Sequence, residues 1–113
     1  MALFALALPI LPGKTPEWRT WMEELKSTRQ QEFAESRQKA GVHERTFLQQ
    51  TPMGDLVIVT LEGDDPGHAF GQLMTGTDAF SKWFGEHAMA AHGDLPMPTA
   101  GLPSELVADS DWA

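Results

Sequence analysis

The sequence contains no cysteine, no tyrosine and no asparagine among its 113 residues. Without cysteine, the chain cannot form disulfides, thiolate zinc sites or cysteine nucleophiles. Without tyrosine and asparagine, a mechanism that needs a phenol is excluded, and one that needs a side-chain carboxamide has to use glutamine. These absences narrow the chemistry that the chain could perform.

A long hydrophobic run is also missing. A membrane helix needs about 20 consecutive apolar residues, and the apolar start of the chain, MALFALALPILPG, is much shorter. It also lacks the basic region and the cleavage site of a secretory signal, so we interpret it as a strand and expect a cytoplasmic protein without a membrane partner. The chain is 42% hydrophobic and 21% charged, which is typical of soluble globular proteins, and its length predicts a single domain over residues 1–113.

Lysine and arginine are scarce after residue 40. The net charge is −8, and after residue 40 the only basic side chains are Arg45 and Lys82. Such an acidic surface repels a phosphate backbone, so we expect no nucleic-acid partner.

A Gly-Lys-Thr fragment at residues 13–15 follows the apolar start, where a nucleotide-binding phosphate loop would carry it. The phosphate-loop pattern needs a glycine five residues earlier, but that position is Leu8. The loop would also contain Pro9 and Pro12, which have no N–H to offer a phosphate. The fragment therefore does not predict nucleotide hydrolysis.

Hydrophobic periodicity and turn residues predict six elements in the order strand, helix, strand, strand, helix, strand. They are a strand at 2–10, a helix at about 16–40 that can divide in two, a hairpin of 42–50 and 55–62, a helical region at 64–93 that pauses at 75–78, and a strand within 104–110. We expect Thr15 to cap the first helix, Ser27 and Gln30 to form a capping box where it restarts, and an acid before Pro66 to cap the second. This is the βαββαβ order of a ferredoxin-like α+β fold, in which an antiparallel sheet carries two helical segments on one face.

The other face of such a sheet would have no cover from its own chain. Its side chains would lie in water. They are Leu3, Ala5 and Ala7, together with every second residue of the strand at 55–62. A second copy of the chain is the simplest cover, so we expect a homodimer that packs sheet against sheet.

Three stretches carry a resemblance to a known family: LALPILPGKTPEW, ERTFLQQTPMGDLVIVTLEGDDP and FSKWF, in this order and spacing. They are similar to a functionally uncharacterised family of small bacterial proteins related to the dimeric α+β barrel superfamily, which includes antibiotic-biosynthesis monooxygenases. The likeness covers residues 2–110. It implies a ferredoxin-like protomer, a homodimer, and a pocket between each protomer's sheet and helices.

The resemblance does not select one function. Relatives include cofactor-free monooxygenases, haem-degrading enzymes, haem peroxidases and dismutases, and stress-response proteins. The haem-degrading branch uses an Asn-Trp-His set and the quinone-forming monooxygenases use Asn, Trp and Tyr, and neither set is complete in a chain without Asn and Tyr. Only Trp83, with His87 or His92, could stand for part of such a set.

Two residues are candidates for catalysis. His87 shares an apolar helical stripe with Phe80 and Trp83, and an imidazole can act as a general base or as an axial ligand; the alternative is a packed histidine with one backbone hydrogen bond. Arg45 could anchor a ligand's carboxylate or phenolate; the alternative is an ion pair with an acid such as Glu62 or Glu44.

Other residues are candidates for the pocket wall. They are Trp21, Phe80 and Trp83 from the helical stripes, and His43, which shares a strand face with Arg45. We interpret His92, beside Gly93, as a cation at the end of its helix. We expect Trp112 to dock onto its own or a partner subunit.

Three functions remain open from the sequence. The first is a small-molecule-binding dimer that resembles a cofactor-independent oxygenase or isomerase, in which His87 moves a proton and Arg45 orients an anionic group. The second is a non-catalytic dimer that binds a ligand or partner for regulation. The third is a haem protein with His87 or His92 as the axial ligand. In the first two readings no metal or cofactor is expected.

Overall fold

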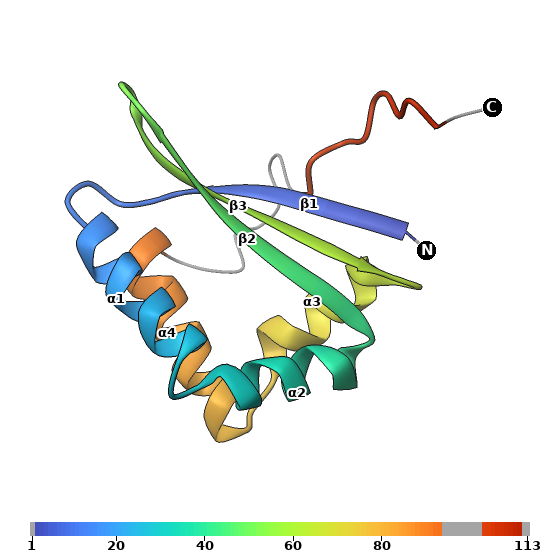
Figure 1. The fold of residues 1–113 in the computed structure, drawn as a ribbon, viewed down its shortest axis with the longest axis horizontal. Coiled ribbons are helices and arrows are strands. Elements are labelled where there is room, and N and C mark those ends of the chain that lie inside the picture. Colours follow the sequence, from blue (N-terminus) through green and yellow to red (C-terminus); the bar gives the residue numbers. More distant parts are fainter. Residues whose placement is uncertain (1, 94–102, 112–113) are drawn as a thin grey trace.

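The structure, a computed structural model, describes residues 2–93 and 103–111. It contains a three-stranded antiparallel sheet with the strand order β1-β3-β2, and four helices that lie on one face of the sheet (Figure 1). The elements are β1 (Ala2–Pro9), α1 (Thr15–Lys26), α2 (Gln30–Ala40), β2 (Val42–Thr51), β3 (Gly54–Gly63), α3 (Pro66–Thr75) and α4 (Ala79–His92). None of the helices in the described residues is both long and apolar enough to cross a membrane.

The predicted hairpin of β2 and β3 is confirmed, with Thr51 paired to Gly54 at its turn. The Thr51 hydroxyl donates to the Gly54 carbonyl (2.6 Å) and accepts from the N–H of Met53 (3.1 Å). Gly54 has a φ of 133°, a conformation that side chains with a Cβ avoid, which explains the glycine at this position. β1 pairs with the other edge of β3, with Leu6 opposite Val59.

Acidic residues cap the last two helices, as the sequence predicts for the helix at Pro66. The Asp65 carboxylate accepts from the N–H of His68 (3.1 Å), which satisfies one of the donors that a helix start leaves open. Asp78 does the same at α4, where the hydroxyl and then the N–H of Ser81 lower the pKa of its carboxyl below the usual value.

The predicted caps of the first two helices are wrong. Lys14 precedes α1 without a side-chain cap, and the Thr15 hydroxyl instead donates to the carboxylate of Asp55 on β3 (2.6 Å). Ser27 donates to the Glu23 carbonyl and therefore closes α1 rather than opening α2, which starts after Arg29 without a side-chain cap. Thr15 thus bonds to a partner distant in sequence, and Ser27 bonds back to the helix that precedes it.

The ferredoxin-like βαββαβ order with two helices is also wrong. Both helical regions are divided completely, so that the sheet carries four helices, and within residues 2–93 and 103–111 there are three strands and no fourth. The segment expected to form the last strand meets the free edge of β1 through a single bond, from the N–H of Ser104 to the carbonyl of Ala5 (2.7 Å). Leu106 and Val107, its large apolar residues, remain 54% and 74% exposed. With so little apolar surface buried, nothing offsets the entropy cost of ordering this segment as a strand.

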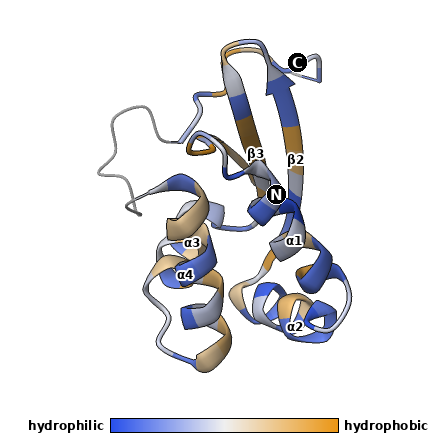
Figure 2. Cartoon of the chain, turned by 90° about the vertical axis from the view of Figure 1, so that its left-hand side faces the viewer, coloured by the Kyte–Doolittle hydropathy of each residue, from blue (hydrophilic) through white to orange (hydrophobic). Residues whose placement is uncertain are grey.

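Strand alternation sends one set of side chains toward the helices and the other set to the opposite face. Leu6, Val57 and Leu61 are the largest fully buried side chains, and they lie on the helix side. Figure 2 shows apolar and polar bands alternating along β2 and β3. The core divides into one cluster between the sheet, α1 and α4, and a smaller one around Val42, Leu61 and Ala69 of α3.

Candidate functional site

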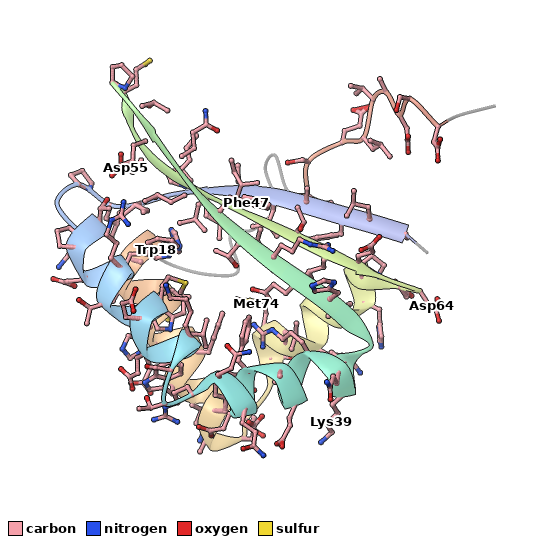
Figure 3. The ribbon with its side chains drawn as sticks, in the orientation of Figure 1. Trp18, Lys39, Phe47, Asp55, Asp64 and Met74 are labelled. Carbon is pink, nitrogen blue, oxygen red and sulfur yellow. The ribbon has the colours of Figure 1, made fainter. Side chains whose placement is uncertain are left out.

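A cavity of about 590 Å³ lies between the sheet and the helices. This is within the size range of small-molecule sites, roughly 300–1,000 Å³. Its wall is mainly apolar, with Leu6, Val57 and Leu61 from the sheet and Trp18, Trp21 and Phe84 from the helices. Figure 3 labels two lining residues from different helices, Trp18 of α1 and Met74 of α3.

The cavity wall contains a buried ion pair that joins α2 to β2. The Nε of Arg37 donates to Oε1 of Glu44 at 2.7 Å, and the two side chains are only 10% and 6% exposed. Both residues line the cavity, as does Thr46, whose hydroxyl is 3.4 Å from the other oxygen of Glu44. Because each charge is matched by the other, the pair places strong hydrogen-bonding groups in the cavity wall without a net charge.

The guanidinium of Arg37 is held between two aromatic rings. Its central carbon lies 4.8 Å from the ring centre of Phe33 and 4.5 Å from that of Phe84. Within the described residues, its polar contacts are the bond to Glu44 and one from Nη1 to the Ser36 hydroxyl (2.9 Å). Since a guanidinium has five N–H donors, several remain for a ligand.

Trp21 lies on the cavity wall, but its indole N–H is buried away from the open space. It is 4% exposed and lines the cavity, and its Nε1–H is buried with no hydrogen-bond partner among the described residues. Burying such a donor without an acceptor costs about 1–3 kcal/mol. Because this nitrogen has almost no accessible surface, it does not face the open space, and Trp21 lines the cavity through other atoms of its side chain.

His92, in the last turn of α4, is partly buried and also lines the cavity. Its Nδ1 lies 2.8 Å from the carbonyl oxygen of Pro9. A carbonyl only accepts, so Nδ1 carries the proton in this bond and Nε2 keeps its lone pair. Burial lowers the pKa of His92 below its ordinary value, an effect that the bond to Pro9 partly opposes.

The structure separates the two residues that the sequence nominates for catalysis. His87 lies in the helix layer, where Nδ1 is 2.9 Å from the Trp83 carbonyl and the ring stacks on Trp21 with centroids 5.7 Å apart. This is the arrangement of a packed histidine with one backbone hydrogen bond, the alternative to a catalytic role. His87 does not line the cavity. Arg45 lies on the outer face of the sheet, paired with Glu62 at 3.3 Å. The sheet separates His87 from Arg45, so they do not face one substrate.

The other nominated pocket residues are divided in the same way. Trp21 lines the cavity, whereas Phe80 and Trp83 pack against each other within the helix layer, with ring centroids 5.7 Å apart. His43 lies with Arg45 on the outer face, opposite Glu62 in the sheet register. Trp112 lies outside the described residues.

Sequence reasoning missed Arg37 and Glu44. A signal was present, because Glu44 shares a strand face with Val42 and Leu48, and a carboxylate on a buried face needs a cation or several donors. Among residues 2–93 and 103–111, no group of three or more His, Asp and Glu side chains could hold a metal ion.

Comparison of the chain with family models, curated proteins and solved structures found no match in any of the three. The resemblance to the uncharacterised bacterial family therefore stays a prediction from the sequence. What the cavity can do has to be argued from its own walls.

Proposed function

We propose that this protein binds a small, mainly apolar molecule in the cavity between its sheet and its helices. The cavity itself is the observation that supports this most directly: about 590 Å³ of space, walled by apolar side chains, with a few polar groups at defined places. An apolar hollow of this size with a few polar groups is the usual form of a small-molecule site. We also propose that the protein is cytoplasmic, as the sequence predicts.

The geometry favours a protein that binds its ligand without catalysing a reaction. An enzyme that used His87 for a proton and Arg45 for an anionic group would need both at one substrate, and they lie on opposite sides of the sheet. In the haem version of the proposal, His92 is the histidine on the cavity wall whose Nε2 is left to bind iron. A visible spectrum that stays unchanged when haem is added would rule out that version.

Two glycines offer a matched test of the cavity. Gly71 in α3 lines the cavity and Gly85 in α4 does not, and in both places an added Cβ would meet no atom within 4 Å. Gly71→Leu should narrow the cavity and weaken binding of the neutral dye Nile red by tenfold or more. Gly85→Leu should leave the affinity within about twofold, because it adds the same side chain elsewhere.

The readout is fluorescence titration with Nile red, together with native mass spectrometry of the protein as purified. Saturable binding that only Gly71→Leu weakens supports the proposal. If neither variant changes the affinity, or the wild-type protein binds no dye and carries no small molecule, the cavity is not a binding site.

We also propose that the protein is a homodimer through the outer face of its sheet. The register places Ala7, Ile58 and Phe47 side by side across the three strands on this face, and none of the four helices in the described part of the chain covers it. Phe47 and Leu3 are 52% and 55% exposed. An exposed apolar row of this kind is stabilised when a second copy excludes water from it.

A further inference from the structure

A second hollow, a groove of about 560 Å³, adjoins the cavity between α1 and β2. Its wall includes Arg19, Glu23 and Lys26 from α1, Phe33 from α2, and Thr46 and Leu48 from β2. Several residues line both hollows, and they belong to the same two elements: Trp18, Met22 and Leu25 of α1, and Glu44 and Thr46 of β2. The cavity and the groove therefore meet where α1 faces β2.

This meeting point is open to solvent at Thr46. β2 is an edge strand, and Thr46 lies on the helix side of the sheet, where it lines both hollows. Thr46 is nevertheless exposed, whereas Val57 and Leu61 on the helix side of β3 are buried. A molecule in the cavity thus has a way out beneath the edge strand, past Thr46 and into the groove.

The groove differs from the cavity in the charges along its wall. Glu23 accepts from Lys26 at 3.0 Å, and Glu44 accepts from Arg37 at 2.7 Å, so both carboxylates of the groove have a cation as partner. None of the ion pairs among residues 2–93 and 103–111 includes Arg19, which is exposed. The groove therefore offers one unpaired positive charge next to an apolar cavity.

We propose that the ligand is a single-chain anionic amphiphile, such as a fatty acid. Its apolar tail lies in the cavity, and its carboxylate lies in the groove at Arg19. This rests on the ligand-binding function proposed above and names the class of ligand. A guanidinium binds a carboxylate through charge-assisted hydrogen bonds, which an uncharged head group forms less strongly and a cationic one not at all.

Three amphiphiles with the same tail test the head group: decanoate, decan-1-ol and decyltrimethylammonium. In calorimetric titrations at pH 7 and low ionic strength, below the concentrations at which they form micelles, we expect decanoate to bind about fivefold more tightly than decan-1-ol. This is the upper range for an exposed ion pair. We expect decyltrimethylammonium to bind most weakly, although the net charge of −8 favours a cation elsewhere on the surface.

Two variants test the role of Arg19. Arg19→Gln removes the positive charge from the groove and should reduce the preference for decanoate over decan-1-ol to less than twofold. Lys39→Gln is the matched control, because Lys39 is also exposed, lies in none of the ion pairs of the described residues, and lines neither hollow. Figure 3 shows Lys39 on α2, pointing away from the sheet. This control should keep the fivefold preference.

Competition with Nile red tests where the tail lies. Decanoate should displace the dye, and Gly71→Leu, which narrows the cavity, should weaken both, whereas Gly85→Leu should weaken neither. Octanoate should bind more than tenfold more weakly than decanoate, because each buried CH₂ tightens binding by about fourfold.

The outcomes distinguish this inference from the function on which it rests. If decan-1-ol or decyltrimethylammonium binds as tightly as decanoate, or Arg19→Gln keeps the preference, the anionic class is wrong although the cavity binds molecules. If decanoate and Nile red bind at the same time, the tail does not lie in the cavity and the inference also fails. If neither the dye nor any amphiphile binds, both the ligand class and the binding function fail.

Discussion

His92 lies at the end of α4, partly buried, with the Nδ1 of its ring bonded to the carbonyl of Pro9. Burial lowers its pKa, so the unfolded chain takes up a proton at a higher pH than the folded protein does. The contribution of His92 to stability is therefore complete above the unfolded pKa of about 6.5 and is lost as the pH falls through the lower, folded pKa. We expect the free energy of unfolding to decrease between pH 7 and pH 5.

Urea unfolding at a series of pH values measures this effect. His92→Gln should flatten the decrease, because glutamine does not titrate but can still donate to Pro9. The control is His68→Gln, which removes an exposed histidine from the start of α3 and should keep the wild-type decrease. An equally steep decrease in His92→Gln would mean that other groups cause the pH dependence.

At the scale of elements, the Arg37–Glu44 pair fastens α2 to β2 across the cavity. Replacing either residue leaves the other charge buried and unpaired, which costs about 3–5 kcal/mol. Arg37→Met and Glu44→Leu should each destabilise the protein by about this amount, whereas the double variant should be within about 1–2 kcal/mol of wild type. Urea denaturation measures all three. If the double variant loses as much stability as the two single variants added together, the two residues are not coupled.

Local signals account for the elements that the sequence predicts correctly. The hairpin follows from two segments rich in β-branched and aromatic residues, joined by a connection with Pro52 and Gly54, and the start of α3 follows from Asp65 before Pro66. The expected last strand had a similar pattern but depended on tertiary burial, which it does not obtain. The role of Thr15 could not be predicted either, because its partner Asp55 is forty residues away.

The candidate site could also be predicted only in part, because it depends on how the whole molecule is arranged. Strand alternation correctly places Arg45 and Glu44 on opposite faces of β2. Strand alternation does not predict which face borders a cavity. The cavity depends on how the four helices pack against the sheet. The cavity's buried pair, Arg37 with Glu44, joins a helix to a strand, and no local pattern specifies such a contact.

The outer sheet face leads to a prediction about assembly. Phe47 ends the apolar row that crosses the outer face through Ile58 and Ala7, so Phe47→Glu would place a charge within the proposed dimer interface. Met53 is 98% exposed at the hairpin turn, which makes Met53→Glu a control with the same charge change outside the sheet face. Sedimentation velocity should show a dimer for wild type and Met53→Glu at micromolar concentration, and a monomer for Phe47→Glu, because a buried unpaired carboxylate cancels the gain from covering the apolar rows. A compact wild-type monomer at this concentration would exclude the dimer, and a dimer that survives in Phe47→Glu would place the interface elsewhere.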